Sequence, residues 1–171
     1  MSTYTIGVDP GWASFGVAIS KDEVLLTKKS YVPKTFSSIS AFILELESLL
    51  TGTYSLGEAD FEKVFLERFV SYSGIQADGE HVLMLIGALV YYFESRRKVE
   101  VNLVRALDWK VKVCQYLVKA KGLSNPYSKL DKKFSVWAAL SLTGDTVKSD
   151  HEADAMCLSF LTKEMLNGKI K

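Results

Sequence analysis

Residues 3–20 carry the sequence TYTIGVDPGWASFGVAIS, which predicts how the fold begins. Two β-rich segments, residues 3–8 and 15–20, lie on either side of the turn signal Asp9-Pro10-Gly11. A third β-rich segment covers residues 23–30. Three short strands with tight connections predict an antiparallel meander, so we expect the first three strands to pair with their chain neighbours.

The remainder of the chain alternates between short apolar runs and longer segments with helical spacing. Strands are predicted at 63–67 and 99–104, and helices at 37–50, 80–97, 107–121, 129–142 and 150–166. This order predicts an α/β fold with a mixed five-stranded sheet flanked by helices. No linker or internal repeat interrupts the pattern, so residues 1–171 are expected to form a single domain.

Composition excludes several classes of protein. The 171 residues are 48% hydrophobic and 24% charged, which predicts a packed core and excludes a disordered chain. A net charge of +1 excludes a uniformly basic nucleic-acid coat, and two cysteines exclude a disulfide framework.

The longest apolar run, 82–93, is too short to span a membrane. With no secretory signal at residues 1–6, we expect a cytoplasmic protein of a bacterium, or of a host cell if phage-encoded.

Two carboxylates stand at the ends of predicted strands. Asp9 directly follows the first strand, and Glu67 ends the buried-type strand 63–67. An unpaired buried carboxylate is costly, and Arg68 would point to the opposite face of the strand. Simpler explanations exist for each residue alone: Asp9 would close an Asx turn, and Glu67 would reach solvent.

A third acidic group opens the last predicted helix. Ser149 and Glu152 have the spacing of a capping box, which places the helix start at this point. His151 and Asp154 are three residues apart and Asp150 and Asp154 four, so either pair can share a helix face. Acidic residues in a first turn also complement the helix dipole without any further role.

Together these groups predict a metal site at one end of the sheet. Asp9, Glu67 and Asp154, with His151 or Asp150, would repel one another unless cations lay between them. Oxygen ligands suit Mg²⁺ or Mn²⁺. Two such ions about 3.5–4 Å apart would support hydrolysis of a phosphodiester.

Basic residues gather in one third of the sequence. Residues 96–133 contain eleven basic side chains and only three acidic ones, which favours a phosphate-binding surface over a set of merely solvated lysines. After Glu67, a loop containing Phe69 and Tyr72 could stack on bases, although Phe69 could equally fold into the core. The helix at 82–93 is apolar nearly all round, which favours burial of one side by a second subunit.

Three motifs carry a family resemblance: IGVDPG at 6–11 with GVA at 16–18, FLERF at 65–69, and HEADA at 151–155. In this order they resemble the RuvC-type Holliday junction resolvases of the RNase H-like superfamily. The helix that retains Gly87 is more similar to the divergent phage-encoded branch. The resemblance implies an RNase H-like fold and a homodimer that makes paired nicks in four-way or other branched DNA. It also implies two Mg²⁺ ions per site, with Mn²⁺ as a substitute, and products with 5′-phosphate ends.

The resemblance also assigns residues. Asp9, Glu67, His151 and Asp154 match the family's metal-binding and catalytic positions, with Asp150 as a substitute for His151. The residues expected to bind DNA are Phe69, Tyr72, Arg105, Lys110, Lys112, Lys129, Lys132 and Lys133. The chain departs from the family in one respect: the family's loop aromatic lies one residue further from the glutamate than Phe69 does.

Three other functions compete with this hypothesis. Sugar-kinase and actin-type ATPases share a similar opening but need two such domains, for which the chain is too short. An RNA-processing nuclease of the same superfamily would carry the same acids. A non-catalytic protein that binds branched DNA would keep the basic residues with a degenerate site, although all four ligand positions here hold competent residues.

Overall fold

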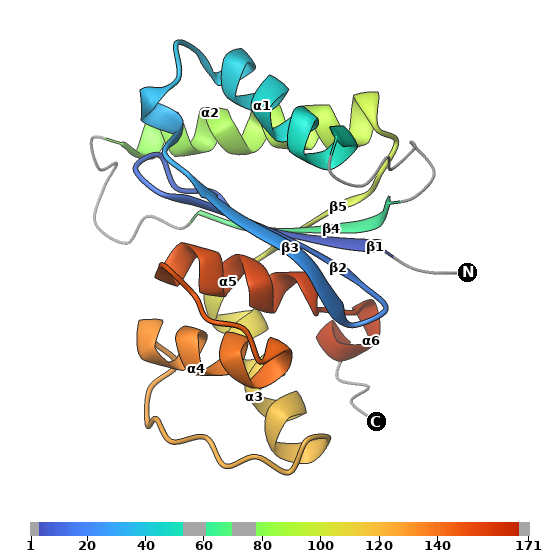
Figure 1. Ribbon diagram of the computed structural model, residues 1–171, viewed down its shortest axis with the longest axis vertical. Coiled ribbons are helices and arrows are strands. Elements are labelled where there is room, and N and C mark those ends of the chain that lie inside the picture. The colour runs from blue at the N-terminus through green and yellow to red at the C-terminus, as the bar shows by residue number, and fades with distance from the viewer. Residues whose placement is uncertain (1–3, 53–60, 70–77, 168–171) are drawn as a thin grey trace.

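The computed structural model describes residues 4–52, 61–69 and 78–167. It contains one five-stranded sheet between two layers of helices (Figure 1). The strands are β1 (Tyr4–Asp9), β2 (Phe15–Lys21), β3 (Val24–Tyr31), β4 (Phe61–Glu67) and β5 (Val101–Val104). The α-helices are α1 (Ile39–Gly52), α2 (Gly79–Val90), α3 (Ala106–Lys119), α4 (Lys132–Thr143), α5 (Asp150–Ser159) and α6 (Lys163–Leu166). A 3₁₀ turn, η1 (Pro33–Thr35), precedes α1, and a π-helical segment, η2 (Tyr91–Arg96), continues α2.

The sheet confirms the predicted fold class. Its strand order is β3-β2-β1-β4-β5, in which β1, β2 and β3 are antiparallel and β4 and β5 run parallel to β1. Val8 of β1 is in register with Leu66 of β4, so Asp9 and Glu67, the next residues of the two strands, emerge at the same edge. The topology therefore brings together two carboxylates that lie far apart in the sequence.

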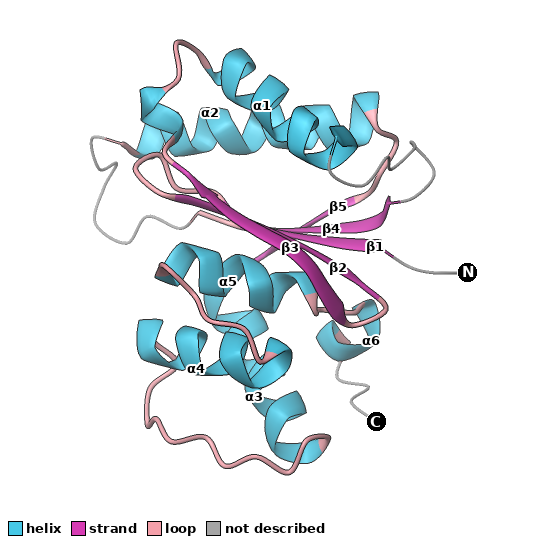
Figure 2. Ribbon diagram, viewed as in Figure 1, coloured by secondary structure: helices cyan, strands magenta, loops and turns pink. Residues whose placement is uncertain are grey.

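Each face of the sheet has its own apolar core. Helices α1 and α2 cover one face, where Ile6, Val8 and Phe42 are fully buried. On the other face α5 lies against the strands, with α3 and α4 beyond it (Figure 2). The alternation of side chains along the strands follows from the pleat: Val64 and Leu66 face the first core, and Phe65 faces the second.

Helix α5 approaches the sheet backbone to backbone, because two glycines face it. A Cβ atom on Gly7 would lie 2.1 Å from the carbonyl oxygen of Ala155. A Cβ atom on Gly16 would lie 2.0 Å from the carbonyl oxygen of His151. The absence of side chains at these two positions places the start of α5 beside the end of β1.

The predicted capping bond at the start of α5 is confirmed in part. Ser149 Oγ accepts a hydrogen bond from the Glu152 backbone N–H at 3.1 Å. The Glu152 carboxylate accepts from the backbone N–H of Lys148, not from Ser149, and from Ser30 Oγ on β3. Glu152 is almost fully buried, with Lys28 Nζ 3.6 Å away, so it fastens the helix to the strand.

Three predicted helices have different bounds in the structure. The helix predicted over 150–166 is divided into α5 and α6, because Thr162 caps a new helix by accepting from the Met165 N–H. The helix predicted from residue 129 begins at Lys132, where the Asp131 side chain accepts two backbone N–H bonds. The helix predicted over 80–97 becomes π-helical from Tyr91. Within the described ranges, no helix has the length and apolar character needed to cross a membrane.

Candidate active site

Four predicted ligand side chains meet at one edge of the sheet. Asp9 and Glu67 end the neighbouring parallel strands β1 and β4. His151 and Asp154 lie in the first turns of α5, which packs closely on Gly7 of β1 and Gly16 of β2. His151 Nδ1 lies 2.6 Å from Asp9 Oδ2, so strand and helix are joined directly at the site.

The Asp9–His151 contact favours a charged imidazole. The hydrogen bond to Asp9 raises the pKa of His151, although burial of the ring opposes this effect. Asp150 and Asp154 add further negative charge nearby, which acts in the same direction.

Glu67 is fixed by a residue that the sequence did not identify. Its Oε2 atom accepts a hydrogen bond of 2.7 Å from Nε1 of Trp109 in α3. Trp109 is fully buried, and its spacing in the helix indicates only core packing. No signal in the sequence predicts that the indole N–H would reach a strand-end carboxylate.

Asp154 and Lys110 form the third contact of the site. Lys110 Nζ lies 3.5 Å from Asp154 Oδ2, and the ammonium group also lies over the Trp109 ring, 5.0 Å from its centroid. Asp154 Oδ1 is buried and has no hydrogen-bond partner among the described residues. Lys110 was predicted to bind DNA from the surface; the structure buries it inside the acidic cluster.

Burial and mutual repulsion raise the pKa values of two of the acids. Burial, followed by the negative charges of Asp9 and Asp154, raises the pKa of Glu67 to about 7. Burial also raises the pKa of Asp154 to about 6, with Lys110 opposing and Asp9 adding to the effect. When all three carboxylates are ionised, they outnumber the two basic side chains that contact them, His151 and Lys110, and this excess of negative charge favours a divalent ion.

The donor set fits such an ion by its chemistry, but the side chains are not arranged around one. Among the described residues, no three His, Cys, Asp or Glu side chains form a ready-made metal site. Three carboxylates are instead turned toward protein donors: Asp9 toward His151, Glu67 toward Trp109 and Asp154 toward Lys110. Among the described carboxylates, Oδ1 of Asp154 is the buried oxygen without a hydrogen bond, while the nearby Ser135 hydroxyl lowers the pKa of the Asp154 carboxyl.

The two candidates for the fourth ligand make different contacts in the structure. His151 contacts Asp9, whereas Asp150 Oδ2 lies 2.5 Å from Lys132 Nζ. Burial would raise the pKa of Asp150, but the Lys132 hydrogen bond and the His151 charge together lower it. Asp150 is therefore held in an ion pair with Lys132, and His151 is the residue joined to the cluster.

The predicted loop aromatic Phe69 lies at this site. A cavity of about 220 Å³ is lined by Asp9, Pro10, Gly11, Glu67, Phe69, Val82 and His151. Phe69 is half-buried and belongs to neither core, so the structure favours a place at the pocket wall over one in the core. The second predicted loop aromatic, Tyr72, lies outside the described residues.

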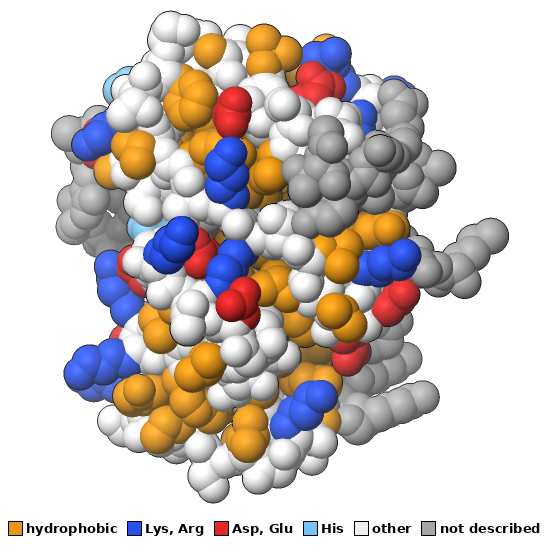
Figure 3. Space-filling view, in the orientation of Figure 1, with side chains coloured by type: hydrophobic (Ala, Val, Ile, Leu, Met, Phe, Trp, Pro, Cys, Tyr) orange, Lys and Arg blue, Asp and Glu red, His pale blue; other side chains and the backbone are white. Residues whose placement is uncertain are grey.

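The other predicted DNA-binding residues are dispersed. Arg105 forms two hydrogen bonds to Asp108, at 2.7 and 3.0 Å, and lines a groove with Lys112. Lys129, Lys132 and Lys133 are exposed. On the face shown in Figure 3, Lys and Arg side chains alternate with acidic and hydrophobic ones and form no continuous basic patch.

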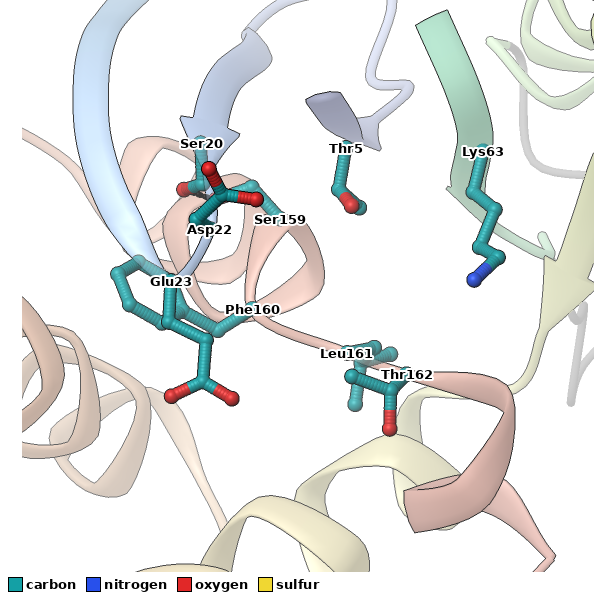
Figure 4. A pocket seen from close by; sticks show the side chains of 9 residues that line it. All are labelled: Thr5, Ser20, Asp22, Glu23, Lys63, Ser159, Phe160, Leu161 and Thr162. Carbon is teal, nitrogen blue, oxygen red and sulfur yellow. Dashed lines mark hydrogen bonds between the residues drawn. The ribbon is translucent and has the colours of Figure 1, made fainter. Parts of the chain in front are cut away.

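A separate hollow lies at the opposite end of the sheet (Figure 4). Asp22, Glu23 and Lys63 are among its lining residues, and its volume is about 190 Å³. Its two buried hydroxyls, Ser20 and Ser159, hydrogen-bond to each other at 2.7 Å. None of the predicted site residues lines it.

Metal-free protein is expected to lose stability as the pH rises from about 5 to about 8. Glu67, Asp154 and His151 all have a raised pKa in the folded state, so folding retains protons that the unfolded chain releases. The contribution of these groups to stability is complete below the pKa values that they have in the unfolded chain. It is lost as the pH rises through their higher pKa values in the folded protein. Each pKa unit corresponds to about 1.4 kcal/mol, and each kcal/mol to roughly 2–4 °C in a domain of this size. The shifts of Glu67 and Asp154 therefore predict that the melting temperature in EDTA falls by roughly 10 °C.

The control for this pH dependence is Glu67→Gln, which removes one titrating group and should flatten the profile. Asp145 and Asp150 have lowered pKa values, so their contributions change only in more acidic solution, outside this range. A melting temperature that rises with pH in EDTA would contradict the arrangement described.

Comparison with known proteins shows what this fold is similar to. No protein-family model matches the chain, and neither does any curated protein. Among solved structures, Thermus thermophilus RuvC in complex with a Holliday junction substrate matches with a TM-score of 0.61 and 16% identity, over 92% of this chain and 90% of that one. A second Thermus thermophilus RuvC structure matches with a TM-score of 0.59 and 18% identity, over 92% and 91%. These matches confirm the predicted fold, which this chain shares with the RuvC structures.

Proposed function

We propose that this chain is a structure-selective DNA endonuclease that resolves Holliday junctions, and other branched DNA, by paired metal-dependent hydrolysis. One observation carries the proposal: the strand-end acids Asp9 and Glu67 lie beside His151 and Asp154 at one edge of a RuvC-type fold. Such an enzyme would act in the cytoplasm of a bacterium or, if phage-encoded, of its host.

The proposed roles follow from the contacts of the site. Asp9, Glu67, His151 and Asp154 would hold two Mg²⁺ ions, or Mn²⁺ in their place. These ions supply activation of water and stabilisation of the leaving oxygen. Lys110 lies within the cluster beside Asp154, where its side chain would contact a phosphate oxygen. Hydrolysis adds a water oxygen to phosphorus and breaks the P–O3′ bond, which leaves a 5′-phosphate and a 3′-hydroxyl.

The proposed DNA contacts lie around this site. Phe69 stands at the wall of the acidic cavity, where a base could stack on it. The exposed Lys129, Lys132 and Lys133 would contact phosphates, which positions DNA without selecting sequence. Arg105 and Lys112 line a neighbouring groove beside Arg68 and would serve in the same way.

A homodimer through α2 is part of the proposal. One face of α2 is buried against the core and carries Val82, Leu85 and Leu89. On the other side Leu83, Met84 and Tyr91 are 53%, 61% and 65% exposed. Gly87 lies between them in helical spacing and has nothing within 4 Å of a Cβ position, so a second helix could approach closely there.

Leu83→Arg is expected to convert a dimer to a monomer at micromolar concentration, because it places a charge in the apolar face of α2. Leu140→Arg is the matched control, since Leu140 is 48% exposed on α4. Sedimentation velocity should show a dimer for the wild type and for Leu140→Arg. A monomeric wild type, or a dimeric Leu83→Arg, would remove the dimer from the proposal.

The function itself is tested by nicking of a labelled, immobile four-way DNA junction with Mg²⁺, with Mn²⁺ and with EDTA. A linear duplex and a structured RNA are tested in parallel. We expect symmetric nicks in the junction that require the metal, with little cleavage of duplex or RNA. Junction binding without cleavage under either metal would favour a non-catalytic binding protein, and preferred cleavage of RNA would favour an RNA-processing nuclease.

A further inference from the structure

Two aromatic rings stack on each other beside the acidic site. The centroids of Trp12 and His81 lie 4.7 Å apart, and the planes of the rings differ by 20°. Trp12 lies in the connection between β1 and β2, and His81 lies in the first turn of α2. Neither ring belongs to an apolar core: Trp12 is half-buried and His81 is exposed. The packing of the core therefore does not explain the pair.

The pair stands at the rim of the acidic cavity. Gly11 and Val82, the direct neighbours of Trp12 and His81 in the chain, both line that cavity together with Asp9, Glu67 and His151. A Cβ atom on Gly11 would lie 3.2 Å from Cε1 of His151, so the β1–β2 connection passes close to the site. A group held on Trp12 would consequently lie near any phosphate bound among the acids.

The chemistry of this rim suits a nucleobase. A flat aromatic ring that is partly open to solvent offers a stacking face to any base, whatever its identity. The backbone N–H of Lys34 donates to the Trp12 carbonyl oxygen at 3.2 Å, which holds the connection in place. Stacking on the protein requires a base with one face not stacked on another base. Such a face is available where a strand passes from one helix to another at a branch point, but not within a continuous duplex.

We propose that Trp12, supported by His81, is a stacking platform for an unstacked base next to the scissile phosphate. The inference rests on the proposed function and deepens it, because it names a contact that distinguishes branched from continuous DNA. Trp12 is in this sense a specificity-determining residue, and His81 is a positioning residue that holds the indole ring.

The test measures DNA binding with cleavage switched off. All variants carry Asp9→Asn, and the probe is a four-way junction with 2-aminopurine at the branch point, beside a duplex of the same sequence. Trp12→Ala should weaken junction binding by about 5- to 150-fold and reduce the fluorescence change of the 2-aminopurine, with duplex binding unchanged. Trp12→Phe should restore most of the affinity, and His81→Ala should cause a smaller loss.

Tyr116→Ala provides the matched control, since Tyr116 is a half-buried aromatic whose hydroxyl reaches Glu23 at the other end of the sheet. It should leave junction binding unchanged, and melting curves confirm that each variant is folded. Two outcomes would overturn the inference and leave the proposed function standing, provided that the Asp9→Asn parent binds junctions. In the first, Trp12→Ala binds junctions as tightly as the parent does. In the second, Trp12→Ala loses affinity for duplex to the same degree as for junctions. If the parent binds no branched DNA, the proposed function fails and the inference with it.

Discussion

Asp9→Asn is expected to lower junction nicking by more than about 100-fold, a larger loss than that usual for residues that only support metal ligands. The physical reason lies in the position of Asp9. Its carboxylate contacts His151, and its charge raises the pKa values of both Glu67 and Asp154. Asparagine keeps the shape of the side chain but removes the charge that two cations would share. Initial rates on the labelled junction in Mg²⁺ and in Mn²⁺ provide the measurement.

Two further readouts separate loss of chemistry from loss of structure. Binding of the junction should persist in Asp9→Asn, because the proposed DNA contacts lie on other residues. The pKa values of Glu67 and Asp154 should fall toward their ordinary range once the neighbouring charge is removed, which NMR titration can follow. Asp22→Asn is the matched control at the far end of the sheet, where a positive φ of 48° suits asparagine. Nicking retained by Asp9→Asn would reject the catalytic assignment.

Gly16→Ala should produce the largest loss of stability, greater than about 4 kcal/mol and enough to lower the melting temperature by about 10 °C or more. Its Cβ atom would lie 2.0 Å from the carbonyl oxygen of His151 and 2.5 Å from the carbonyl carbon. Both are backbone atoms of α5, so no change of side-chain rotamer relieves the contact. The helix must move away from the sheet, and His151 must move away from Asp9 with it.

The control is Ser48→Ala, an alanine substitution at an exposed position of α1, away from the site and from the proposed dimer face. It should stabilise the protein slightly, by about 0.5 kcal/mol, because alanine is the better helix former. Thermal unfolding followed by circular dichroism compares the two variants with the wild type. A Gly16→Ala protein that melts near the wild-type temperature would show that α5 does not depend on this close approach.

Much of the fold could be predicted because its signals are local. Period-two and helical spacing of apolar residues identified the strands and helices, and the turn at Asp9-Pro10-Gly11 predicted the first antiparallel pair. Where predicted and observed helix boundaries differ, a capping side chain sets the boundary. At Thr162 the cap begins a new helix, although the helical spacing of apolar residues continues past this position. Spacing alone does not show which of several capable polar residues will act as a cap.

Asp9 and Glu67 could be singled out from the sequence because carboxylates that follow apolar strands are unusual, and parallel strands end at the same edge. The sequence left two candidates for the position on α5. Their different contacts appear only in the packed helix, because Gly7 and Gly16 set its distance from the sheet. In that position His151 contacts Asp9, and Asp150 contacts Lys132.

The residues that surround the acids were decided by tertiary structure alone. Trp109 and Lys110 have the helical spacing of ordinary core and surface residues, yet α3 brings them to Glu67 and Asp154. Trp12 and His81 meet only because the β1–β2 connection and the start of α2 close over the same strand ends. The sequence by itself determined the sheet, the strand-end acids and the start of α5, since each depends on neighbouring residues. Which side chains touch across the sheet depends on how whole elements pack, a property that no local pattern contains.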